Sequence, residues 1–296
     1  MSFKEYVQNY QSLSILNDQC FLRKKQPTCN ATHGNLRKKN QQLDEIHNST
    51  KPSPFISIDA SVTYLDHTVF WQDDPLNNGS DEMEVFTPHR IHHFVPHAKA
   101  IAILRNPVER LISDFYFFIE GSSKLNPDLL HTLVENGINW WENCTAVLPE
   151  SKCAFGVNFK DYGLPNLPQG FFSWGELTGD GNNGAARLRM GIYSNYLERW
   201  FKVFGRENIL VIQMEQYSKN IAHTLTQEVL PFLELDPFLE RELAELNKHQ
   251  KQLPKNVSKK KDQKKVYDRT RQMLENFYRP YNQRLATLLN DKVYLW

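Results

Sequence analysis

One short segment combines an arginine, an asparagine and a serine at a spacing that suits anion binding. Residues 100–104 are apolar and predict a buried strand that ends at Arg105. Asn106 is a preferred helix cap and Pro107 a preferred first helical residue, so a helix should begin there. Arg105 then lies at the carboxyl end of a strand, where α/β sheets bind ligands, and Ser113 lies less than two turns into the helix. The pair could share one phosphate, although an ordinary strand-to-helix connection fits the spacing equally well.

The complete sequence of this segment gives a more specific indication of what it binds. Residues 105–115 read R-N-P-V-E-R-L-I-S-D-F. They are similar to R-[ND]-P-x-E-R-x-x-S-[DH]-[YF], the segment of Golgi carbohydrate sulfotransferases that binds the 3'-phosphate of 3'-phosphoadenosine 5'-phosphosulfate (PAPS). The resemblance implies that Arg105 and Ser113 bind this phosphate. Further similar segments occur in the same order, at 59–61, 187–200, 209–217 and 277–285.

This resemblance extends over roughly residues 54–296, which we expect to form the sulfotransferase domain behind a polar N-terminal arm at 1–53. It implies an α/β fold similar to P-loop proteins, with a central parallel sheet flanked by helices, and the alternation of strands and helices favours the same architecture. The expected elements are strand 55–59, strand 99–104, helix 107–120, helix 187–204, strand 209–214 and helix 221–230, the last ended by Pro231. The long excursion at 121–184 is expected to help form the acceptor cleft.

One family feature is absent from the sequence. Sulfotransferases of this type open with a strand and a P-K-x-G-T-[TS] loop, whose backbone N–H groups hold the 5'-phosphosulfate. No such loop occurs here, and the glycine-rich run at 175–184 lacks lysine and favours a surface turn. We therefore expect a domain whose first strand and phosphate loop are missing, in an N-terminally truncated chain that by itself transfers no detectable sulfate.

The resemblance also implies a reaction and its partners. It is strongest to the enzymes that sulfate chondroitin, which implies transfer of sulfate from PAPS to a glycosaminoglycan hydroxyl. The specific expectation is the 6-position of N-acetylgalactosamine 4-sulfate in chondroitin sulfate. The acceptor is then a sulfated glycosaminoglycan. A non-catalytic glycan-binding protein derived from a sulfotransferase is the alternative, and a P-K-x-G-T loop encoded upstream would favour the enzyme.

The general base for this reaction is the least defined residue. Related enzymes use Glu or His, and Asp59 lies near the position of a family acidic residue that is commonly Glu. Asp59 is therefore a weak catalytic candidate, and no other residue is assigned to catalysis. Arg110 has two interpretations, because it can contact the ligand or form an ion pair with Asp114 one turn further along the helix.

Basic residues concentrate near the C-terminus. Residues 251–271 contain nine Lys or Arg against Asp262 and Asp268. The lysines at 259–265 occupy the place where related enzymes have a loop that closes on the nucleotide, and they also suit a sulfated polymer, although a solvated loop fits equally well. Nucleic acid is disfavoured as a partner because aromatic residues do not alternate with these charges.

Four histidines are a second cluster of potential ligands. They are His89, His92, His93 and His97. Their spacing suits positions on and beside one helix better than a metal site, and sulfotransferases of this type need no metal. We expect no metal here.

Cysteines and glycosylation sequons indicate the compartment. Five Asn-x-Ser/Thr sequons favour the secretory pathway, at Asn30, Asn48, Asn78, Asn143 and Asn256. Cys20 with Cys29 and Cys144 with Cys153 form two local pairs, for which disulfides and free thiols both remain open, and counterparts in the resembled enzymes favour the Cys144 and Cys153 disulfide. No apolar run approaches the roughly 18 residues of a membrane span. The resemblance implies a type II membrane protein of the Golgi lumen, whose anchor is absent from this chain.

Overall fold

The structure is a computed structural model of the 296-residue chain. It describes Leu65, Trp71, 75–77, Ser80, 83–118, 126–156, Gly163, 185–252 and 266–296. These residues all belong to one unit of the chain, Ser61–Trp296. Several predicted features lie outside the described residues, namely Asp59, the strand at 55–59, Cys20 and Cys29, the lysines at 259–265 and four of the five sequons.

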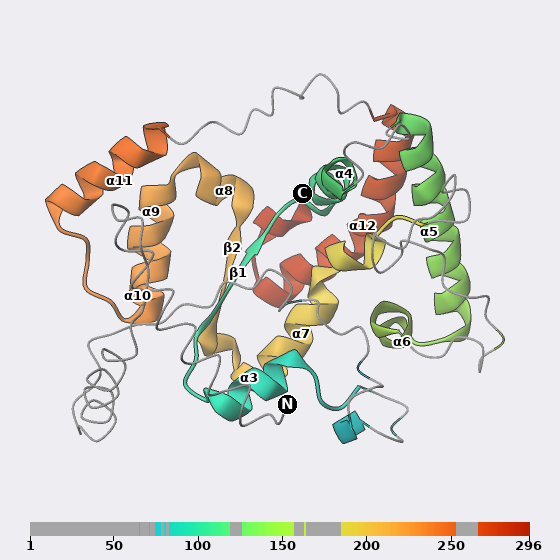
Figure 1. The fold of residues 1–296 in the computed structure, drawn as a ribbon, viewed down its shortest axis with the longest axis horizontal. Helices are drawn as coiled ribbons and strands as arrows, with labels where there is room; N and C mark the ends of the chain where they lie inside the picture. Colours follow the sequence, from blue (N-terminus) through green and yellow to red (C-terminus); the bar gives the residue numbers. More distant parts are fainter. Residues whose placement is uncertain are drawn as a thin grey trace, which may run out of the picture. The chain divides into compact units, whose positions relative to one another are not determined.

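Two parallel strands form the sheet of the described residues (Figure 1). β1 (Ala100–Leu104) pairs along its whole length with β2 (Ile209–Gln213), so that the first residues of the two strands lie opposite each other. Each strand leads into a helix, β1 into α4 (Pro107–Phe118) and β2 into α8 (Met214–Lys219). The predicted parallel sheet flanked by helices is therefore confirmed. Because parallel strands end at the same edge, the two strand-to-helix turns are neighbours.

One face of the sheet packs on α7 (Tyr193–Phe204) and α12 (Asp268–Leu289). Tyr193 and Leu197 are spaced one helical turn apart, and both are buried against Leu104 at the end of β1. The first residue of α7 is thereby placed beside the end of β1.

A larger apolar cluster joins α4 to α5 (Pro127–Val147) and α12. Asn126 caps α5 by accepting a hydrogen bond from the N–H of Leu129 at 2.7 Å, and Pro127 follows the cap. Leu111 and Phe115 of α4 are fully buried in the cluster. Within the predicted excursion at 121–184, the described residues include α5, which packs into the core.

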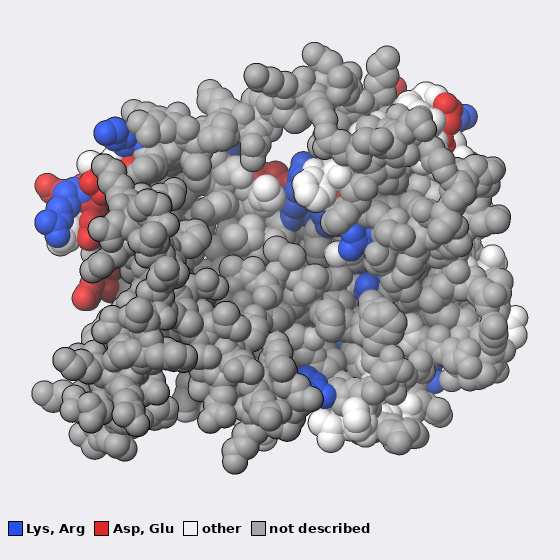
Figure 2. Space-filling model, in the orientation of Figure 1, with Lys and Arg blue, Asp and Glu red and all other residues white. Residues whose placement is uncertain are grey.

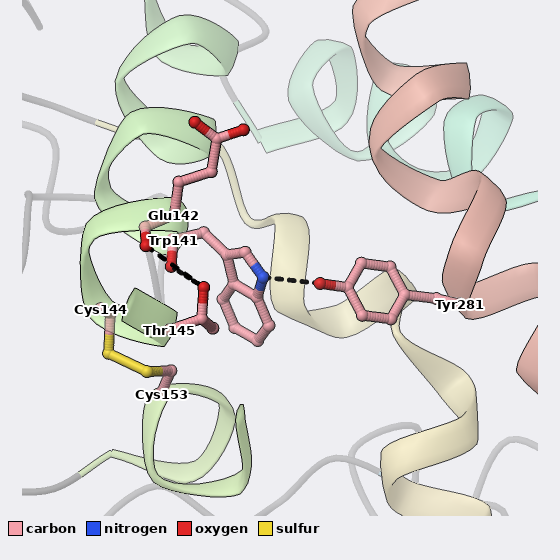
Figure 3. The surroundings of a disulfide bond; sticks show 6 residues. All are labelled: Trp141, Glu142, Cys144, Thr145, Cys153 and Tyr281. Atoms are coloured by element: carbon pink, nitrogen blue, oxygen red, sulfur yellow. Dashed lines mark hydrogen bonds between the residues drawn. A yellow bond between two sulfur atoms is a disulfide. The ribbon is translucent and has the colours of Figure 1, made fainter. Parts of the chain in front are cut away.

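A disulfide joins α5 to the short helix α6 (Glu150–Phe155) (Figure 3). Cys144 and Cys153 form this bond, which confirms the predicted pairing. In the same region the indole N–H of Trp141 donates a hydrogen bond to the hydroxyl of Tyr281 in α12 at 2.7 Å. The end of α5 is thus fixed on two sides, covalently to α6 and by a hydrogen bond to α12.

Two predicted helices have different boundaries in the structure. The helix expected over 187–204 is a 3-10 turn (Leu188–Gly191) followed by α7. At Gly191 the ring of Tyr278 fills the space of a side chain, since an added Cβ would lie 2.7 Å from it. The backbone therefore approaches α12 closely at this point, and the regular α-helix begins two residues later.

The helix expected to end at Pro231 continues beyond it. It consists of α9 (Ile221–Thr224), a π-helical turn (Leu225–Val229) and α10 (Leu230–Leu233). Pro231 falls in the first turn of α10, where its missing N–H is tolerated. The helix ends instead at Glu234, whose φ of 58° is left-handed.

Five further helical segments complete the described part of the chain. They are the 3-10 turns Pro75–Asn77, Arg206–Asn208 and Lys292–Leu295, with α3 (Thr87–Phe94) and α11 (Glu240–Gln252). In the described part of the chain, every helix is too short or too polar to cross a membrane.

Candidate functional site

The turn between β1 and α4 forms as the sequence predicts. The side-chain oxygen of Asn106 accepts hydrogen bonds from the N–H groups of Val108 at 2.9 Å and Glu109 at 3.2 Å. These bonds satisfy two of the donors that a helix leaves unpaired at its start. Asn106 is therefore the cap of α4, and Arg105 stands between the end of the strand and the cap.

Arg105 and Ser113 are both partly buried. Within the described residues, the guanidinium group of Arg105 and the hydroxyl of Ser113 form neither a hydrogen bond nor an ion pair. Ser113 lies about 9 Å along the helix axis from Pro107. Figure 2 shows basic side chains at the surface near the start of α4. A partly buried cation without a protein partner is suited to an anionic ligand.

The backbone of Arg105 is held by side chains of other elements. Its carbonyl oxygen accepts a hydrogen bond from the hydroxyl of Tyr193 at 2.9 Å. The N–H of Asn106 donates to the carboxylate of Glu215, in the first turn of α8, also at 2.9 Å. Burial raises the pKa of Tyr193 to about 12, so its hydroxyl stays protonated and donates at neutral pH.

Arg110 forms the ion pair that was one of its two predicted roles. It contacts Asp114 at 3.2 Å, and Arg187 contacts the other oxygen of the same carboxylate, also at 3.2 Å. Arg110 further donates to the carbonyl oxygen of Arg187 at 3.0 Å. The three side chains are 13–17% exposed. These contacts give Arg110 a structural role.

Comparison with known proteins identifies the family of the chain. Residues 30–280 match the family described as "Sulfotransferase domain". The chain belongs to this sulfotransferase family.

Several proteins with similar sequences share the name carbohydrate sulfotransferase 15. The human protein named carbohydrate sulfotransferase 15 is 28% identical over 258 residues, which cover 86% of this chain and 41% of that protein. A protein of the same name from Nototodarus sloanii is 40% identical over 181 residues, covering 59% of this chain and 98% of that protein. The chain thus spans about two fifths of the length of the human relative.

A solved structure is also similar. The crystal structure of a sulfotransferase from Alicyclobacillus acidocaldarius aligns with 78% of this chain and 64% of its own, at 17% identity and a TM-score of 0.42.

Three residues of the candidate site were not predicted from sequence. They are Tyr193, Glu215 and Arg187, whose partners lie on the segment 105–114. Tyr193 and Glu215 fall within segments that resemble the family, but neither segment carries a signal of what its side chain contacts. Glu215 had one local indication, since it follows directly after an apolar strand that ends at the ligand-binding edge of a parallel sheet.

The predicted histidine cluster lies on α3 and just after it. His92 packs edge-on against the ring of Phe204, and His89 packs against Phe86 in the same way. Burial, together with the charges of Arg199 and His92, lowers the pKa of His89. Among the described residues, no group of three His, Cys, Asp or Glu side chains is arranged to hold a metal ion. His89 and His92 of α3 are packing residues, and His93 is exposed.

Proposed function

We propose that the protein is a carbohydrate sulfotransferase that transfers sulfate from PAPS to a hydroxyl group of a glycosaminoglycan. The observation that carries this proposal is the identity of 28–40% to relatives named carbohydrate sulfotransferase 15, in a chain of the sulfotransferase family. The reaction breaks the bond between sulfur and the 5'-phosphate oxygen of PAPS, and it forms a bond from sulfur to the acceptor oxygen. The acceptor proton passes to a base, for which Asp59 is the candidate in this sequence.

The residues at the end of β1 fit the donor. Arg105 supplies a positive charge that no described residue neutralises, and Ser113 supplies a hydroxyl donor on the same segment. In the proposed complex both side chains bind the 3'-phosphate, with charge-assisted hydrogen bonds from the guanidinium group. They thereby position the nucleotide and leave the chemistry at the 5' end to other groups.

The proposed acceptor position is the 6-hydroxyl of N-acetylgalactosamine 4-sulfate in chondroitin sulfate, and the proposed location is the Golgi lumen. A sulfated polymer is complementary to the nine basic residues at 251–271. The disulfide between Cys144 and Cys153 suits an oxidising compartment of the secretory pathway.

The test is a transfer assay with the native protein that carries this chain. The protein is incubated with labelled PAPS and chondroitin 4-sulfate, and the product is digested to disaccharides and separated. The expected product is N-acetylgalactosamine sulfated at positions 4 and 6. Arg105→Ala should reduce the rate at limiting PAPS at least tenfold, because one charge-assisted contact is lost. Arg241→Ala, which removes an exposed arginine of α11, is the matched control and should leave the rate unchanged.

The other outcomes separate the alternatives. Label at a different hydroxyl would overturn the proposed position but retain the enzyme class. Binding of chondroitin sulfate without transfer, and without measurable affinity for 3'-phosphoadenosine 5'-phosphate, would favour the non-catalytic glycan-binding protein.

A further inference from the structure

A single peptide group at the end of β1 is held by side chains from two other elements. This group consists of the carbonyl of Arg105 and the N–H of Asn106. The carbonyl accepts from the Tyr193 hydroxyl and the N–H donates to the Glu215 carboxylate, each at 2.9 Å. The pairing of β1 with β2 ends one residue earlier, at Leu104. Side chains therefore replace the backbone partners that a continuing sheet would provide.

We propose that Tyr193 and Glu215 are positioning residues, which fix the Arg105–Asn106 peptide so that the Arg105 side chain is preorganised for the 3'-phosphate. This inference rests on the proposed function, because it assigns the two residues to the nucleotide site. Neither residue is proposed to touch the nucleotide. Their effect is on the direction in which the Arg105 side chain leaves the backbone.

The two contacts come from a core residue of α7 and from the capped first turn of α8. Tyr193 is 6% exposed and packs in the core cluster that includes Leu104. Glu215 lies in the first turn of α8, which Gln213 caps by accepting from the N–H of Gln216 at 3.2 Å. A peptide fixed from α7 and α8 cannot rotate without breaking a hydrogen bond to one of these helices.

Glu215 uses one of its two carboxylate oxygens for the contact to Asn106. One carboxylate oxygen accepts from Asn106, whereas Oε2 is buried without a hydrogen-bond partner among the described residues. An amide side chain could supply the single acceptor that Asn106 needs. The proposed positioning role therefore needs the acceptor oxygen and not the second carboxylate oxygen.

A positioning role has a specific physical consequence. The strength of a hydrogen bond depends steeply on distance and angle, so a guanidinium group that samples several directions binds phosphate less well than a fixed one. Loss of the peptide contacts should therefore weaken the contribution of the 3'-phosphate to binding. Binding of the rest of the nucleotide should change little.

The test compares two nucleotides that differ only in this phosphate. Calorimetry measures the affinities of the protein for 3'-phosphoadenosine 5'-phosphate and for adenosine 5'-phosphate. The ratio of the two affinities isolates the contribution of the 3'-phosphate to binding. We expect this ratio to fall about fivefold in Tyr193→Phe and in Glu215→Ala, the equivalent of one hydrogen bond. Glu215→Gln retains an acceptor for Asn106 and should restore the ratio to within about twofold of the original.

Tyr294→Phe is the matched control. Tyr294 is also a buried tyrosine, and its hydroxyl donates to a strand carbonyl, that of Val211 in β2, at 3.1 Å. Its loss should reduce stability as Tyr193→Phe does, yet leave the nucleotide ratio unchanged. An unchanged ratio in both Tyr193→Phe and Glu215→Ala would overturn the positioning role. Equal affinities of the unmodified protein for the two nucleotides would instead overturn the proposed nucleotide site, and this inference with it.

Discussion

The turn that carries Arg105 and the middle of α4 that carries Arg110 use arginine in opposite ways. At the turn, the backbone of Arg105 is held by Tyr193 and, through the next N–H, by Glu215, and its guanidinium group has no partner among the described residues. In the middle of the helix, the guanidinium group of Arg110 is itself held, by Asp114 and by a backbone carbonyl. The first arrangement leaves a charge available to a ligand, and the second uses a charge to join α4 to the segment of Arg187.

This difference predicts that stability and nucleotide binding can be changed separately. Removing one partner of a buried ion pair destabilises a fold, because the other charge stays buried without compensation. The guanidinium group of Arg105 has no partner among the described residues, so we expect it to contribute little to folding and to form its favourable interactions with the proposed ligand. Substitutions at the Arg110 cluster should therefore change the free energy of unfolding, whereas substitutions at Arg105 should change the affinity for the nucleotide.

The largest effect is expected for Asp114→Ala. The substitution removes the carboxylate that both Arg110 and Arg187 contact, and it leaves two partly buried guanidinium groups without that partner. We expect a loss of about 3–5 kcal/mol in the free energy of unfolding, measured by urea denaturation. A loss below about 1 kcal/mol would contradict the structural role of this cluster, because it would mean that water replaces Asp114 at little cost.

Arg105→Ala should change nucleotide binding and leave stability nearly unchanged. We expect the affinity for 3'-phosphoadenosine 5'-phosphate to fall tenfold or more, because a charge-assisted hydrogen bond contributes about 1.5–3 kcal/mol. The free energy of unfolding should stay within about 0.5 kcal/mol of the original, since no described partner is lost. Calorimetry and urea denaturation on the same preparation measure both quantities. Equal affinities of the original and variant proteins would remove Arg105 from the site.

Sequence predicts those structural features of the two regions that depend only on neighbouring residues. The apolar run of β1, the cap at Asn106 and the proline at 107 lie within a few residues of one another, and their preferences decide the turn without help from the rest of the chain. The same reasoning located Arg105 at the end of the strand. The disulfide of Cys144 also closes a short loop, because Cys153 lies nine positions further along the chain.

The parts that sequence did not predict depend on distant packing. The bonds to the Arg105–Asn106 peptide join residues 88 and 109 positions apart, and Arg187 lies 73 positions from Asp114. Their formation depends on how α7 and α8 pack beside β1, which no local pattern encodes. The late start of α7 has the same cause, because the ring that fills the space at Gly191 belongs to Tyr278 in α12.

The smallest effect is expected for Ser113→Ala, and it decides whether one phosphate is shared. The serine hydroxyl can give the ligand one hydrogen bond, so its loss should reduce the affinity for 3'-phosphoadenosine 5'-phosphate about two- to tenfold. Stability should not change, because the hydroxyl bonds to no described residue. The informative measurement is the double variant with Arg105→Ala. If both side chains bind the same phosphate, their effects on the binding free energy should not add. Additive effects would instead indicate that Arg105 and Ser113 contact separate parts of the ligand. They would contradict the interpretation that the two side chains share one phosphate.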